Sequence, residues 1–136
     1  MSETGPHIHL VSRLRELLDE IGEVVDSDAE SVVLQVGRTR ASVRAIALAE
    51  DLEVLAVTQL VALNLPNTEA LRDDVETHDA KLSFGSLRRS DPDGVTTDVL
   101  LYYTFPLGGL SDVALLTVLH LVLATGAEIA VELVSA

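Results

Sequence analysis

Apolar residues near the start of the chain recur at alternating spacings of four and three, and charged side chains occupy the positions between them. This period matches one face of an α-helix, so the pattern predicts an amphipathic helix over residues 8–25. Pro6 suits the first helical turn, and the segment 26–28 is a stop signal. Dimeric coiled coils use the same spacing, but the stretch is short for one, so we expect the helix to pack on the protein's own sheet. The apolar stripe consists of Leu10, Leu14, Leu17, Ile21 and Val24, widened by Val11, Leu18 and Val25.

Three strand-like segments follow, separated by short polar turns. Residues 31–36 and 52–65 are runs of apolar and β-branched residues, and residues 42–49 alternate between two faces. Such segments are typical of β-strands, and tight turns between successive strands indicate antiparallel neighbours. Pro66 ends the third strand, because proline cannot donate a backbone hydrogen bond to a sheet ladder.

The next part of the chain predicts a second helix and then a hairpin. Asn67 or Thr68 can cap a helix that runs to about Asp79 and has a thin apolar face. After it, two alternating segments flank the sequence Ser90-Asp91-Pro92-Asp93-Gly94, which is a strong turn signal. The pattern therefore predicts an antiparallel hairpin made of residues 81–89 and 95–105.

The segment 112–125 is apolar nearly all round, which is typical of a helix that is buried in the fold or partly in an interface. Ser111 suits the N-cap of this helix, and Gly126 is a position at which it can end. Residues 127–134 fit both a strand alternation and a helical row spaced by four. We interpret them as continued helix and keep a strand as the alternative.

The predicted order is helix, three strands, helix, two strands and helix, which defines an α+β fold with an antiparallel sheet. We expect the terminal helices to pack on that sheet, because an exposed apolar sheet face would aggregate. The length of 136 residues suits a single domain over residues 1–136, and we expect residues 1–6 to be flexible.

Charge excludes two classes of partner. The chain has 22 acidic and 9 basic residues and a net charge of -13, so it repels phosphate groups and anionic membrane surfaces. We therefore expect no nucleic-acid or membrane partner. The apolar stretch 113–124 is too short to span a bilayer, no signal peptide is evident, and cysteine is absent. These features predict a cytoplasmic protein.

Candidate catalytic and metal-binding residues are few. His7 and His9 have a spacing that metals can use, but a site needs further ligands. The segment 91–94 has part of a calcium-loop pattern, which we interpret as an ordinary hairpin turn. His78 and Asp79 lie on a solvated helix, where acid-base chemistry is disfavoured. The sequence predicts no catalytic residue, no metal site and no cofactor.

His120 lies within the apolar helix. The first interpretation is a core histidine bonded to a backbone or side-chain partner. The alternative is a histidine at a dimer interface, where its titration would make association sensitive to pH. The interface would then be formed by Leu116, Leu119, His120 and Leu123.

The element order, together with three stretches of apolar and turn residues, resembles the YbjN-type domain and the related fold of type III secretion chaperones. The stretches are Val61–Thr68, Leu82–Leu87 and Asp98–Thr104, and the resemblance covers about residues 8–134. The resemblance implies a module that dimerises or binds peptides and has no known catalytic residues. It transfers no site residue to this chain.

Two functions from different classes remain. The first is a non-catalytic protein-binding module, chaperone-like or adaptor-like, that forms a homodimer and binds itself or another protein chain. It rests on the hydrophobic content of 48%, because a domain of this size has a limited interior and surplus apolar surface tends to mark an interface. The alternative is a regulatory domain that binds a small molecule under the last helix, in a cavity lined by Ala45, Ala47, Ala56 and Ala62. Neither function is an enzyme.

Overall fold

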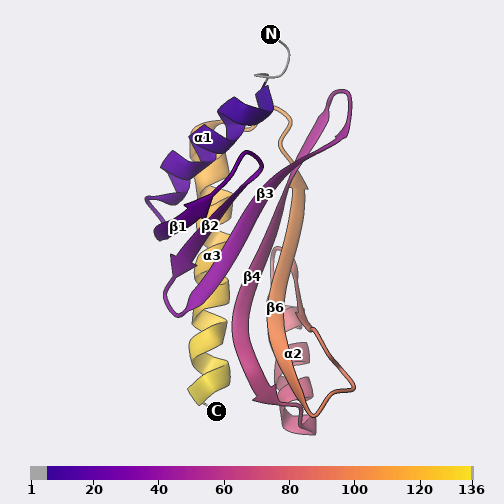
Figure 1. Cartoon of the computed structure of the whole chain (residues 1–136). Helices are drawn as coiled ribbons and strands as arrows, with labels where there is room; N and C mark the ends of the chain where they lie inside the picture. The colour runs from indigo at the N-terminus through magenta and orange to yellow at the C-terminus, as the bar shows by residue number, and fades with distance from the viewer. Residues whose placement is uncertain (1–5, 136) are drawn as a thin grey trace.

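The computed structural model describes the backbone of residues 6–135 and the side chains of residues 11–133. In these residues the chain forms three helices and one six-stranded antiparallel sheet, with the strand order β1-β2-β3-β4-β6-β5 (Figure 1). The α+β fold class is therefore as predicted, with one strand more than the sequence indicated. The elements are α1 (Pro6–Leu18), β1 (Glu23–Ser27), β2 (Ser31–Val36), β3 (Thr39–Ala49), β4 (Leu52–Pro66), α2 (Glu69–Lys81), β5 (Ser86–Arg89), β6 (Thr96–Pro106) and α3 (Asp112–Ser135).

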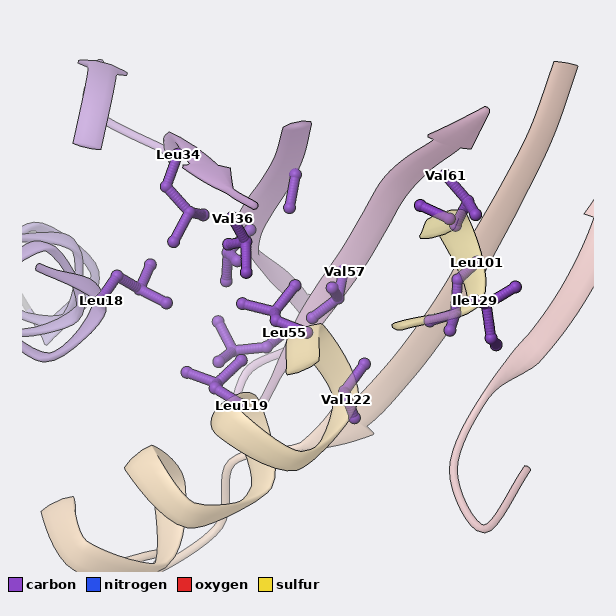
Figure 2. Packing of buried hydrophobic residues seen from close by; sticks show 14 of the residues in the cluster. Leu18, Leu34, Val36, Leu55, Val57, Val61, Leu101, Leu119, Val122 and Ile129 are labelled. Carbon is purple, nitrogen blue, oxygen red and sulfur yellow. The ribbon is translucent and has the colours of Figure 1, made fainter. Parts of the chain in front are cut away.

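The helices pack on one face of the sheet, which we call the inner face. Helix α3 runs along the length of the sheet, while α1 and α2 lie toward its opposite ends (Figure 1). Figure 2 shows side chains of α3 and α1 meeting those of β2, β4 and β6 between the two layers. The alternation along each strand sends every second residue into this core. One row across the sheet, entirely buried, consists of Leu34, Ala41, Gln59, Leu101 and Leu87.

The prediction of a first helix that reaches residue 25 is wrong. Helix α1 ends at Leu18, and a turn closed by the bond from the Gly22 amide to the Leu18 carbonyl (3.1 Å) leads into β1. A Cβ atom at position 22 would overlap the carbonyl oxygen of Gln35, so only glycine allows the chain to pass this close to β2. Residues 23–27 then gain ladder hydrogen bonds with β2, which local helical periodicity does not reveal. The expectation of flexibility for residues 1–5 lies outside the described residues, while Pro6 begins α1.

Helix α3 continues through Gly126 to Ser135, so residues 127–134 are helical as interpreted. Gly126 does not end the helix, because its missing side chain leaves room for the buried amide of Gln59. The Gln59 Nε2 atom donates to the Leu123 carbonyl (3.0 Å) and to the Thr39 hydroxyl (2.8 Å). The glycine is therefore a contact point between α3 and β4.

The predicted hairpin forms between β5 and β6, with Ser86 opposite Tyr102 and Arg89 opposite Val99. Its first strand begins at Ser86 and not at residue 81, because α2 extends two residues past the predicted end. Gly85 joins the two elements at a φ of 82°, and a Cβ atom there would crowd the backbone of Tyr102. Of the two residues predicted as possible caps of α2, Thr68 is the cap, since its hydroxyl accepts from the Leu71 amide (3.1 Å).

We predict that Gly126→Ala lowers the free energy of unfolding by about 1–3 kcal/mol, because the added methyl group collides with buried Gln59. Alanine's helix propensity alone would raise stability by about 1 kcal/mol. Urea denaturation of Gly126→Ala in the wild-type and Gln59→Ala backgrounds separates the two effects. The stability lost through Gly126→Ala should shrink or change sign when residue 59 is alanine. A Gly126→Ala variant that is more stable than the wild type would contradict the contact.

A second prediction concerns the β1–β2 turn, where Asp28 Oδ1 accepts from the amides of Glu30 (2.8 Å) and Ser31 (2.9 Å). These backbone hydrogen bonds lower the pKa of Asp28 below its ordinary value of 3.8. Because the folded pKa is the lower one, the carboxylate stabilises the fold above pH 3.8, and this contribution disappears as pH falls through the folded pKa.

Titration of the Asp28 carboxyl carbon by NMR should give a midpoint below 3.8. The stability difference between wild type and Asp28→Asn should be largest above that pH and decline below it. A midpoint at or above 3.8, or a difference that does not vary with pH, would contradict the role of the turn.

Candidate protein-binding surface on helix α3

Helix α3 has one face against the sheet and one face open to solvent. Leu115, Leu119 and Leu123 are completely buried on the inner side. On the other side, Val113 is 77% exposed, Leu121 49% and Val131 47%. These residues recur at helical spacing, so they form one stripe along the helix. We call this the outer stripe: Val113, Thr117, His120, Leu121, Ala124, Glu128 and Val131.

The structure divides the four residues predicted as an interface between the two faces of α3. Leu119 and Leu123 belong to the core, so their side chains face the sheet and not a partner. Leu116 is half-buried at the border, and His120 is exposed in the outer stripe. The interpretation of His120 as a core histidine is therefore wrong. A helix that is apolar nearly all round does not reveal which side meets its own sheet, so the sequence could not separate these residues.

An open hollow lies beside the outer stripe, between the turn after α1 and helix α3. The hollow has a volume of about 300 Å³ and is lined by Glu20, Ile21, Leu116, Thr117, His120 and Leu121. The alanines expected to line a ligand cavity lie elsewhere. Ala45 and Ala62 are packed in the core, Ala47 is exposed on β3, and Ala56 is half-buried on β4. Arg13 of α1 donates to the Leu110 carbonyl (3.2 Å) and contacts Asp112, which joins α1 to the start of α3.

The unbroken helix is longer than the apolar stretch expected from the sequence. The segment 112–133 has a mean hydropathy of 1.9, so by length and composition it could cross a bilayer. Here, however, the helix lies against a sheet, and Leu115, Leu119 and Leu123 are completely buried in the core. Figure 2 shows Leu119, Val122 and Ile129 of this helix facing the sheet. One face of the helix is thus part of the protein's own core.

The other titratable residues considered from the sequence have structural contacts. His78 of α2 lies 3.2 Å from the Glu132 carboxylate of α3, and the Asp79 carboxylate accepts the Leu87 amide (2.8 Å). These contacts tie α2 to α3 and to β5. Within the described residues, no three His, Asp or Glu side chains gather as metal ligands. The side chains of His7 and His9 lie outside the described residues.

Asn67 organises the hairpin turn, a role that the sequence did not reveal. Its Nδ2 atom donates to the carbonyls of Asp91 (3.2 Å), Pro92 (2.9 Å) and Gly94 (2.8 Å). Its Oδ1 atom accepts from the Arg89 guanidinium (2.7 Å). The segment with part of a calcium-loop pattern is thus a hairpin turn as interpreted, and three of its carbonyl groups point to an amide of the same chain.

Comparison with known proteins places this arrangement of helices and strands among solved folds. No protein-family model and no curated protein sequence matches the chain significantly. The class defined by the structure is an α+β domain with a helix-covered antiparallel sheet.

Within this class the chain has a YbjN-type fold. YbjN, a proposed transcription regulator from E. coli, superposes with a TM-score of 0.62 at 12% identity, over 91% of this chain and 90% of that chain. An uncharacterised protein from Methanothermobacter thermautotrophicus superposes with a TM-score of 0.59 at 14% identity, over 91% of this chain and 96% of that chain. At identities this low, the structural likeness establishes the fold alone.

We predict that Asn67→Ala destabilises the protein by about 2 kcal/mol, because it removes the donor shared by three turn carbonyls and the acceptor of Arg89. Asp93→Ala is the matched control, since this exposed side chain of the same turn makes no hydrogen bond to a described residue, and it should change stability by less than about 0.5 kcal/mol. Urea denaturation measures both. Equal effects of the two substitutions would contradict the role of Asn67.

Proposed function

We propose that this protein is a non-catalytic protein-binding module that forms a homodimer through the outer stripe of helix α3. The observation that carries the proposal is the exposure of Val113, Leu121 and Val131 on a helix whose other face is already packed. Apolar residues that are aligned along one exposed helix face are typical of a surface covered by a partner. A chaperone-like or adaptor-like role in the cytoplasm would use the dimer as its binding unit.

The distribution of residues along the stripe favours a second copy as the occupant. The stripe is nearly symmetric about residue 122, so in an antiparallel pair of α3 helices related by a twofold axis, Val113 lies opposite Val131 of the partner. Leu121 then lies beside the small Ala124 of the other copy, which allows the two helices to approach closely. A twofold dimer uses the same patch twice and therefore needs this self-complementarity.

The charge of the protein also favours a second copy as the occupant of the outer stripe. The chain carries a net charge of -13, so two copies repel each other over most of their surfaces. Glu128 is the one acidic residue in the outer stripe. Along 24 residues, the helix presents about 36 Å of contact length. A patch of low charge on a strongly acidic molecule is where two copies associate with least repulsion.

A regulatory domain that binds a small molecule is the second candidate. The observation that favours it is the hollow between the turn after α1 and α3. Its volume of about 300 Å³ lies at the lower limit of typical ligand sites, and one side is open to solvent. Native mass spectrometry of the purified protein tests this function, since a bound small molecule adds a defined mass.

Light scattering coupled to size-exclusion chromatography tests the dimer. We predict a mass of about twice 14.5 kDa for the wild type and about 14.5 kDa for Leu121→Glu/Val131→Glu, because two carboxylates would then be buried unpaired in the interface. Val95→Glu is the matched control, since Val95 is 92% exposed in the turn before β6, and it should remain dimeric. Circular dichroism verifies folding. A monomeric wild type, or a double variant that still dimerises, would contradict the proposed interface.

A further inference from the structure

The sheet face opposite the helices, which we call the outer face, carries a charge unlike that of the rest of the molecule. In the described part of the chain no helix covers it, and on β2–β6 its charged residues are three arginines and one aspartate. The aspartate, Asp98, accepts the Asn64 amide (2.9 Å), so it is occupied by a local contact. On these five strands the face is thus basic on a chain of net charge -13, while β1, at one edge of the sheet, adds the carboxylates of Glu23 and Asp26. The arginines are Arg40, Arg44 and Arg88.

Strand register places two of these arginines on either side of two leucines in one row, which continues beyond Arg40 to Gln35 and Glu23. Arg40 lies opposite Leu60, Leu60 opposite Leu100, and Leu100 opposite Arg88. The two leucines are half-buried and the two arginines are exposed. Because neighbouring strands lie about 4.8 Å apart, the backbones at the two arginines are separated by about 14 Å. The part of the row on β3, β4, β6 and β5 is thus an apolar strip with a guanidinium group at each end.

The two end arginines have no ion-pair partner among the described residues, although the chain has more than twice as many acidic residues as basic ones. Arg88 lies over the ring of Tyr102 on the same face, 5.8 Å from its centroid, which holds the guanidinium at the surface. Arg44, in contrast, is 3.9 Å from Glu30. Arg40 and Arg88 are therefore available to carboxylates from outside the chain.

We infer that the outer face binds a segment of another protein in which apolar residues are flanked by acidic ones. The apolar side chains would contact Leu60 and Leu100, and the flanking carboxylates would pair with Arg40 and Arg88. In an extended segment that crosses the strands, a span of about 14 Å corresponds to about four residues, at about 3.4 Å per residue. Guanidinium groups suit this role, because they bind carboxylates through two parallel hydrogen bonds.

The net negative charge of the chain disfavours nucleic acid as the occupant of the outer face. A polyanion brings many phosphates into the field of a chain with a net charge of -13, whereas a short segment brings two or three carboxylates. The half-buried leucines between the arginines also offer apolar contact in place of a continuous track of phosphate-binding groups. This surface lies on the side of the sheet opposite α3, so the inference does not depend on the proposed dimer.

Selection of peptides on the full-length protein tests the inference, with a phage-displayed library of random twelve-residue peptides as the probe. We expect the enriched peptides to carry acidic residues on both sides of apolar ones. Fluorescence anisotropy of a labelled enriched peptide should show binding that weakens with salt. The affinity for this peptide should fall by more than about tenfold in the variant Arg40→Glu/Arg88→Glu. NMR shift changes should centre on Leu60 and Leu100.

Arg72→Glu is the matched control, because Arg72 is an exposed arginine on α2, and it should bind the peptide as the wild type does. Arg40→Gln/Arg88→Gln serves as a second variant in case the charge reversal perturbs folding, and it should also weaken binding. Light scattering should give the same mass for both double variants as for the wild type. The inference is overturned by enriched peptides without acidic residues, by equal binding to the double variants, or by preferential binding of a twelve-residue oligo-dT strand.

Discussion

The contact between Gln59 of β4 and Gly126 of α3 is the constraint on which the arrangement of the molecule depends. Gln59 is completely buried, and its amide donates to α3 and to Thr39 of β3. The missing side chain at position 126 lets the helix approach the middle of the sheet. With that contact in place, leucines on both sides of it along α3 reach the inner face, and the helix can run the length of the sheet (Figure 1).

This close packing also decides which surface of α3 remains open. A helix held against the sheet by one face must present its opposite face to solvent, and on α3 that face is still apolar at Val113, Leu121 and Val131. Burial of such side chains on association is favourable by roughly 25 cal/mol per Å² of apolar area removed from water. The same geometry thus completes the core and leaves the surface through which we propose that two copies associate.

The sheet separates the two chemical surfaces of the protein. Its inner face and helices form the core and carry the apolar outer stripe, whereas its outer face carries arginines around half-buried leucines. Strand alternation produces this division, because successive residues of one strand point to opposite sides. Thr39, for example, is buried beside Gln59, and Arg40, the next residue, is exposed on the other face. Two different interactions can therefore be carried by one small domain.

Local sequence by itself determined the elements whose signals lie within a few residues. Thr68 caps α2 because its hydroxyl reaches an amide three residues ahead, and the turn residues 90–94 between two alternating segments predict the β5–β6 hairpin. Tertiary structure decided the rest. Gly126 continues a helix because a side chain from β4 fills the space beside it, and residues 23–25 form a strand because β2 lies alongside them. His120 is exposed because of where α3 meets the sheet. These outcomes depend on contacts between residues distant in the sequence, and such contacts leave no local periodicity to detect.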